Sequence, residues 1–190
     1  MSSVSTSSSV AVVTGAARGI GLASAQWFLA QGYRVVRLDN DAPSLTASAA
    51  SLAEPARVLD VVCDVSQPAQ VHAAVDTIRS TFGRVDALVN NAGVAVFKPI
   101  GETTFEEWRY VMSTNLDGIF LCTQAFAPLM QQGGGGAGAA GHCRLQQGNY
   151  PRHADGWLAP SWNGSPAALH ALASSSLIWC CNVVRSPGRL

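Results

Sequence analysis

The chain has 190 residues, of which 48% are hydrophobic and 13% are charged, and its 12 basic and 12 acidic side chains give a formal net charge of zero. This length fits one domain with a sizeable core, and the balanced charge argues against a nucleic-acid or anionic-membrane partner. Residues 1–9 are rich in serine and lack the basic and apolar parts of a secretory signal, so we expect a disordered tail and a cytoplasmic protein.

The first predicted strand begins at Val10 and runs into a turn that holds Gly15, Gly19 and Gly21, and a helical pattern starts at Ile20. Gly15 permits a tight turn, Gly19 lets the backbone approach a pyrophosphate, and Gly21 lets the helix pack closely on the strand. The N–H groups and the positive end of that helix would face the anion. The spacing therefore predicts a dinucleotide-binding turn, and an ordinary strand-to-helix turn is the alternative.

The second predicted strand, residues 33–38, ends at Asp39, which lies 18 residues after Gly21. A carboxylate at this offset can accept hydrogen bonds from the adenosine ribose and would repel a 2′-phosphate. Asp39 therefore favours NAD over NADP, although Arg18 in the turn and Arg37 beside it are both candidates to pair with a phosphate. The alternative for Asp39 is a helix N-cap or an acid in a turn.

The next predicted elements are a short surface helix, a third strand, a helix and a fourth strand, at residues 43–54, 58–63, 67–82 and 85–89. Asp64 and Val65 follow the third strand, where an acid that caps the next helix is one interpretation. The fourth strand runs into residues 90–93, Asn-Asn-Ala-Gly. Small residues and amides at this place can border a cofactor and stabilise the sheet, although they are also common in plain turns.

The glycine turn and Asn-Asn-Ala-Gly, which are separated by about 75 residues, together resemble the short-chain dehydrogenase/reductase family over roughly residues 9–131. The resemblance implies an α/β fold, a three-layer Rossmann-type doubly wound parallel sheet of order 3-2-1-4, and hydride transfer between NAD(H) and an alcohol or ketone. It also implies that the Asp64-Val65 pair contacts the adenine. The expected cofactor-binding residues are Gly15, Arg18, Gly19, Ile20, Gly21, Asp39, Asp64, Val65, Asn91, Ala92 and Gly93.

A long helix is predicted from Phe105, capped by Thr103 or Thr104. Its expected apolar stripe comprises Phe105, Trp108, Met112, Leu116, Ile119 and Phe120. Asn115 lies within this helix and matches the family asparagine that holds a water in a proton relay to the catalytic lysine. A buried polar residue satisfied by its neighbours is the alternative. The family commonly forms oligomers through this helix and the following one, so a homo-oligomer is possible.

The family pattern stops at a glycine-rich linker, residues 133–141. The family would next supply a catalytic serine and Tyr-x-x-x-Lys, but the only lysine of this chain is Lys98, and no tyrosine has a lysine four residues later. Residues 10–132 are therefore the expected dinucleotide-binding domain, followed by an atypical and poorly ordered tail over residues 142–190. Its apolar stretch, residues 167–184, favours a helix, and the fourth strand would be an open edge of an incomplete sheet.

We hypothesise that the residues after about 138 come from a changed reading frame or an alternative exon. The interpretation is an oxidoreductase that keeps the cofactor half and is catalytically impaired, with a small alcohol or carbonyl as substrate if it is active. The alternatives are a non-catalytic nucleotide-binding module and a truncated product that folds poorly. No metal is expected, because the spacing of His142, Cys143 and His153 fits no familiar zinc site.

Overall fold

The computed structural model describes residues 9–133 and 182–185 of the chain. Its sheet has five strands, β1 (Val10–Thr14), β2 (Arg34–Asp39), β3 (Val58–Val62), β4 (Ala87–Asn90) and β5 (Asn182–Arg185), in the order β3-β2-β1-β4-β5. The first four strands are mutually parallel, which confirms the predicted order 3-2-1-4. All five residues of β1 are buried, as expected for a central parallel strand covered on both faces.

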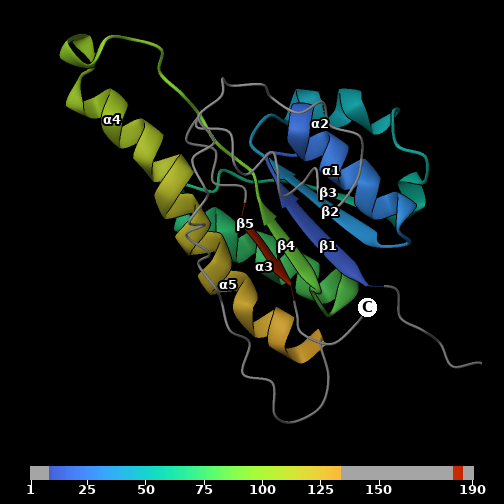
Figure 1. Ribbon diagram of the computed structural model, residues 1–190. Coiled ribbons are helices and arrows are strands. Elements are labelled where there is room, and N and C mark those ends of the chain that lie inside the picture. Colours follow the sequence, from blue (N-terminus) through green and yellow to red (C-terminus); the bar gives the residue numbers. More distant parts are fainter. Residues whose placement is uncertain (1–8, 134–181, 186–190) are drawn as a thin grey trace, which may run out of the picture.

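β5 runs antiparallel beside β4, and Asn182 pairs with Asn90 (Figure 1). Two expectations are therefore wrong: β4 is not the edge of the sheet, and residues 182–184 are extended and not helical. An edge strand presents unpaired N–H and C=O groups that another strand can satisfy. The two consecutive valines at 183 and 184 have the β-branched side chains that favour this conformation.

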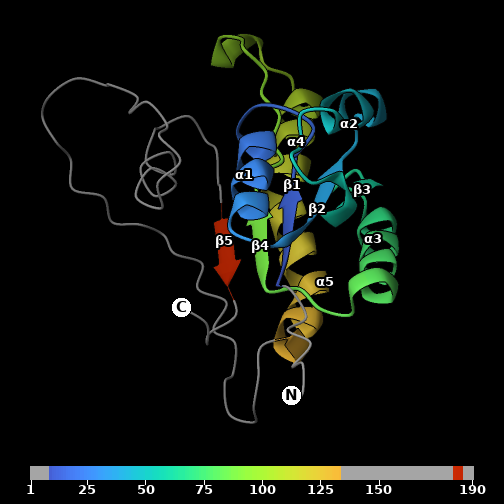
Figure 2. The same cartoon turned by 90° about the vertical axis from the view of Figure 1, so that its right-hand side faces the viewer.

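Helices cover both faces of the sheet (Figures 1 and 2). On one face, α1 (Gly19–Ala30) packs against β1, β2 and β4, and Phe28 and Leu29 join Val13 and Val35 in one core cluster. On the other face, α3 (Pro68–Phe82) and α5 (Gly118–Gly133) contribute to a second cluster. The members of that cluster include Val12, Val36, Ile78, Leu88 and Phe126. The arrangement is the predicted three-layer doubly wound α/β fold.

The two remaining helices are short. α2 (Ala42–Ala49) follows β2 and is capped by Asp41, whose side chain accepts a hydrogen bond from the backbone N–H of Ser44. α4 (Phe105–Met112) begins with a capping box, in which Thr104 and Glu107 each bind the other's backbone N–H. Thr104 is therefore the cap of the long helix. Within the part of the chain described, no helix is long and apolar enough to cross a membrane.

The long helix consists of α4, a π-helical segment at Ser113–Asp117, and α5. The predicted apolar stripe is not its buried face: Trp108, Leu116 and Phe120 are 49%, 60% and 63% exposed. The residues that α5 buries are instead Cys122, Phe126, Leu129 and Met130. A π-helical segment takes more residues per turn than an α-helix, so it rotates the following side chains around the axis. The π-helical segment thus accounts for the exposure of Leu116 and Phe120, whereas Trp108 precedes it and is already exposed in α4.

Gly118 lies where the long helix packs closely on the segment after β3. A Cβ built on Gly118 would lie only 2.8 Å from Cγ2 of Val65, the residue that follows Asp64 after β3. Val65 itself is 5% exposed. Glycine at position 118 thus lets α5 pack directly on the chain between β3 and α3, which fixes the inward face of the helix.

Candidate dinucleotide site

The turn between β1 and α1 is crowded at two of its three glycines and open at the third. Gly15 has φ of 64°, and a Cβ there would lie 2.8 Å from Cα of Ala92. Gly21 is more crowded, because its Cβ would lie 2.0 Å from the carbonyl oxygen of Gly15 and 2.6 Å from Nδ2 of Asn91. Gly19 has φ of 56°, and a Cβ added there would meet no atom within 4 Å, so the space above it is open. An open backbone at Gly19 is what close approach of a ligand requires.

Thr14 and Asn91 join this turn to the end of β4, and we call their contacts the Thr14–Asn91 clasp. Thr14 Oγ1 accepts hydrogen bonds from the backbone N–H groups of Asn91 and Ala92, both at 2.9 Å, and donates to the carbonyl of Val89 at 3.3 Å. Asn91 Nδ2 donates to the carbonyls of Thr14 at 3.0 Å and Gly15 at 3.1 Å. The two sequence motifs are therefore two sides of one hydrogen-bonded structure. These contacts of Thr14 were not predicted from the sequence.

The N-terminus of α1 faces outward from this turn. Arg18 is its N-cap residue, with extended backbone and no capping hydrogen bond from its side chain, and the first turn contains no acidic residue. Arg18, Gly19 and Ile20 are exposed. The first N–H groups of a helix have no partner within it, and they carry the positive end of the helix dipole. This end of α1 therefore has the character of an anion site.

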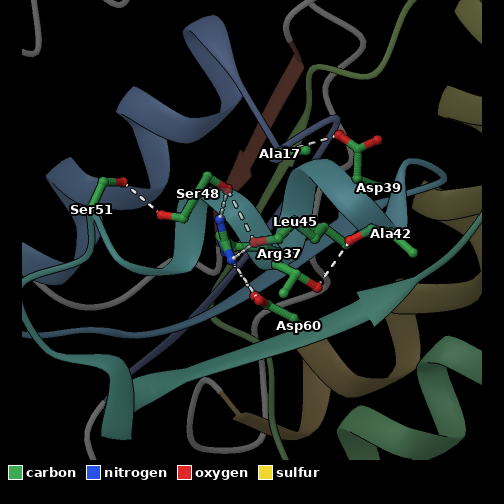
Figure 3. Close-up of polar contacts among 9 residues, drawn as sticks. Ala17, Arg37, Asp39, Ala42, Leu45, Ser48, Ser51 and Asp60 are labelled. Carbon is green, nitrogen blue, oxygen red and sulfur yellow. Dashed lines mark hydrogen bonds and ion pairs between the residues drawn. The ribbon is translucent and has the colours of Figure 1, made fainter.

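Asp39 lies at the carboxyl end of β2 and is 9% exposed. Its Oδ2 accepts from the backbone N–H of Ala17 at 2.9 Å (Figure 3), and its Oδ1 accepts from the backbone N–H of Asp41 at 3.0 Å. The carboxylate thus ties the glycine turn to the second strand and retains lone pairs for further donors. Of its two alternative interpretations, the acid in a turn describes the bond to Asp41, whereas the N-cap of α2 is Asp41 itself.

Arg37 is fully buried and cannot reach a cofactor phosphate, so that expectation is wrong. Its Nε donates to Asp60 at 2.7 Å, Nη1 to the hydroxyl of Ser48 at 2.7 Å, and Nη2 to the carbonyl of Leu45 at 2.9 Å (Figure 3). Its side chain is 0% exposed. Arg37 points to the face of β2 that α2 covers, and its guanidinium serves to hold α2 and β3 together.

Arg18, by contrast, lies at the N-terminus of α1 and has a side chain that is 74% exposed. Its Nη2 lies 3.0 Å from Oδ2 of Asp41. The pKa of Asp41 is lowered, first by the hydrogen bonds that its carboxylate accepts from Ser44 and then by the charge of Arg18. Arg18 is therefore the arginine that the structure places beside Asp39 and the glycine turn with its charge toward solvent.

The pair after β3 is less clearly directed to a ligand. Oδ1 of Asp64 accepts from the backbone N–H of Ser66 at 2.9 Å and from its hydroxyl at 2.7 Å. Asp64 is thus an acid in a turn, but it does not cap α3, whose N-cap is Gln67. Val65 packs under the long helix. The contact of these two residues with adenine stays a prediction.

Asn115 lies in the π-helical segment, and both ends of its amide bind one residue after β4. Oδ1 accepts from the backbone N–H of Val94 at 2.8 Å, and Nδ2 donates to the carbonyl of Val94 at 2.9 Å. The side chain is therefore satisfied by a neighbour, as the alternative interpretation expected. Its role in a proton relay stays a prediction.

The carboxyl ends of β1, β2 and β4 meet at one edge of the sheet because these strands are parallel. Hydrogen bonds join Asn91 to Gly15 and Asp39 to Ala17 there, whereas Asp64 binds Ser66 and Gln70. The chain leaves β1 toward β2 on one side and β4 lies on the other, so this edge is the topological switch point, where ligands of such folds bind. The residues considered for zinc, His142, Cys143 and His153, lie outside the described residues.

Comparison with known proteins agrees with this geometry. Residues 9–138 match the short chain dehydrogenase family. The chain is 42% identical over 129 residues to D-threitol dehydrogenase of Mycolicibacterium smegmatis, covering 67% of this chain and 50% of that protein. It is 41% identical over 128 residues to the NADP-dependent (R)-specific alcohol dehydrogenase of Lentilactobacillus kefiri, covering 67% and 51%. The chain thus spans about half the length of these relatives.

A solved structure shows the same likeness in three dimensions. A short-chain dehydrogenase/reductase from Burkholderia phymatum in complex with NAD superposes with a TM-score of 0.63 and 36% identity, over 66% of this chain and 45% of that one. The family match ends at residue 138, where the sequence pattern was expected to stop. From the two linked motifs, the strand order and these matches, the chain belongs to the short-chain dehydrogenase family.

Proposed function

We propose that this chain binds NAD(H) at the edge formed by β1, β2 and β4. In this arrangement the pyrophosphate lies against the N-terminus of α1, above Gly19, and the adenosine ribose lies at Asp39. The observation that carries the proposal is the Thr14–Asn91 clasp, which holds the glycine turn open toward solvent with no side chain capping the helix. A preformed turn of this kind avoids the cost of ordering a loop when a ligand binds.

Two features support NAD over NADP. Asp39 is nearly buried at the end of β2, where a carboxylate accepts hydrogen bonds from ribose hydroxyls and repels a 2′-phosphate. Arg37, which would offset that repulsion, is occupied by Asp60, Ser48 and Leu45. The relatives include an NADP-dependent enzyme and a structure with NAD, so the choice rests on the residues of this chain.

We further propose that the chain is catalytically impaired as an alcohol or ketone oxidoreductase. The sequence contains no Tyr-x-x-x-Lys, and its one lysine, Lys98, forms an ion pair with Glu107 at the start of α4. A tyrosine needs a neighbouring cation to lower its pKa before it can exchange protons near neutral pH. A change of reading frame or exon after about residue 138 remains our hypothesis for this loss, and reading the gene in its other frames tests it.

A homo-oligomer is the third part of the proposal. Phe105, Trp108, Leu116 and Phe120 are all at least 49% exposed along the long helix. Large exposed apolar side chains on one helix favour an interaction surface, and a second copy of the chain is the partner that the family resemblance implies. Sedimentation of the purified chain, with Trp108→Ser as the comparison, should show an association that the substitution weakens.

One experiment on the purified full chain tests binding and catalysis together. NADH is titrated by its fluorescence, and a panel of secondary alcohols is then tested with NAD. We expect a dissociation constant that is micromolar or weaker, which corresponds to a binding free energy no more favourable than about −8 kcal/mol. We expect no turnover. A folded sample that does not bind NADH would refute the cofactor site and favour a non-catalytic product with another role. Oxidation of any alcohol above background would refute the impairment.

A further inference from the structure

We propose that Asp41 is a specificity-determining residue, which keeps Arg18 in an ion pair and thereby withholds it from a cofactor 2′-phosphate. The inference rests on the proposed function, because it concerns the same nucleotide site. Asp41 would thus disfavour NADP in addition to Asp39, the acid from which the preference for NAD was predicted. It also explains why an exposed arginine in the glycine turn need not indicate NADP.

The carboxylate of Asp41 is held in place from several directions. The backbone N–H of Asp41 donates to Asp39 at 3.0 Å, which fixes this residue beside the ribose-binding position. Its Oδ1 accepts from the N–H of Ser44 at 3.0 Å, and its Oδ2 accepts from the Ser44 hydroxyl at 2.7 Å. The side chain of Asp41 is 28% exposed and that of Arg18 is 74% exposed. Asp41 is thus the fixed member of the pair, and Arg18 is the member that a ligand would have to move.

The charges of Arg18 and Asp41 determine whether the site attracts or repels a cofactor 2′-phosphate. Arg18 alone would attract a 2′-phosphate, since guanidinium groups bind phosphates through paired N–H donors. Asp41 compensates its charge and adds a second carboxylate next to Asp39. The hydrogen bonds from Ser44 lower the pKa of Asp41, so its carboxylate stays ionised at neutral pH. A dianionic 2′-phosphate therefore meets two negative groups and an arginine that is already paired.

Of the two arginines considered for binding a 2′-phosphate, Arg18 is the one whose side chain is exposed. Arg37 is buried, and its donors are committed to α2 and β3. Release of Arg18 from Asp41 is then the simplest way for the site to accept NADP. An exposed ion pair contributes modestly, so we expect a change at position 41 to shift the cofactor preference without reversing it.

The test is Asp41→Asn, because asparagine can still accept from the N–H of Ser44 and cap α2 while the charge is lost. The measured quantity is the ratio of NADPH affinity to NADH affinity, from fluorescence titrations of the full chain. We expect this ratio to rise about three- to tenfold, an effect of one charge near the surface. Asp76→Asn is the matched control, since Asp76 also pairs with an arginine, Arg79, but lies on α3. It should leave the ratio unchanged.

A second substitution shows whether Arg18 is the group released. In the double variant Arg18→Ala with Asp41→Asn, the gain for NADPH should disappear. The gain in Asp41→Asn should also shrink as salt is raised, because salt screens exposed charges. If the wild-type chain binds NADH but Asp41→Asn leaves the ratio unchanged, or the double variant keeps the gain, the inference on Asp41 is wrong and the proposed function stands. If neither chain binds either dinucleotide, both are wrong.

Discussion

Replacing Thr14 with valine tests the Thr14–Asn91 clasp, because valine has nearly the shape of threonine but no hydroxyl. Thr14 is 2% exposed, so water cannot readily take the place of that hydroxyl. The substitution leaves the backbone N–H groups of Asn91 and Ala92 without the acceptor that both now share at 2.9 Å. It also removes a longer bond to the carbonyl of Val89, at 3.3 Å.

The magnitude follows from the number of donors left unpaired. Each buried polar group without a partner costs about 1–3 kcal/mol. The two N–H groups share one acceptor, so their costs need not add in full, and we expect the free energy of unfolding to fall by about 2–4 kcal/mol. Thr14→Ser is the matched control. Serine keeps the hydroxyl and loses one buried methyl group, which costs about 1 kcal/mol.

Urea unfolding of the wild-type chain and both variants, followed by circular dichroism, measures the difference. With a slope of about 2 kcal/mol per molar urea, Thr14→Val should lower the midpoint by about 1–2 M, and Thr14→Ser by about half a molar or less. The valine variant should also lose NADH affinity, since Gly15 and Asn91 would no longer be held together. Equal midpoints for valine and serine would show that the hydroxyl does not support the turn.

Three further predictions concern the turn, the buried arginine and the buried thiols. Gly21→Ala should destabilise the chain more than Gly19→Ala in the same urea assay, because a Cβ meets an atom at 2.0 Å at position 21 and none within 4 Å at position 19; equal losses would contradict this. Arg37→Met should lower stability by about 1–3 kcal/mol, less than the loss for a fully buried pair, because Asp60 is 32% exposed and regains water; a thermal melt unchanged from wild type would argue against the anchoring role. Burial raises the pKa of Cys63 to about 11 and that of Cys122 to about 12, from the usual 9.0. The unfolded thiols lose their protons first, so stability should fall as pH rises from about 9 to about 11, and replacing both cysteines with alanine should reduce that fall. A fall of the same size in the double variant would assign it to other groups.

The parts of the fold that sequence predicted well are those encoded by local spacing. The glycines at 15, 19 and 21 and the apolar run before them specify strand, turn and helix within a dozen residues. Regular alternation of strands and helices then leads to the parallel order of β1 to β4. The structure joins the two motifs at one edge of the sheet, and the sequence did not predict the hydrogen bonds of Thr14 that connect them.

The predictions that failed depend either on contacts between distant segments or on a local change of helix type. The prediction that Arg37 could bind a phosphate failed because Arg37 is buried by contacts that its own neighbours in the sequence do not reveal. These contacts come from Asp60, on another strand, and from α2, which folds over it. The apolar stripe of the long helix failed for Leu116 and Phe120 because the π-helical segment at Ser113–Asp117 changes the angular position of later residues. The pairing of β5 with β4 joins segments about 90 residues apart, which no local pattern can reveal.

The double hydrogen bond between Asn115 and Val94 joins the two regions for which we propose separate tasks, the long helix and the chain after β4. Val94 follows the Asn-Asn-Ala-Gly motif directly, and Asn115 lies between Trp108 and Phe120, whose rings face solvent. Any shift of the long helix caused by a protein that covers those rings would therefore pull on the backbone next to the nucleotide edge. Occupancy of the two surfaces would then be thermodynamically linked, so that each ligand alters the affinity of the other.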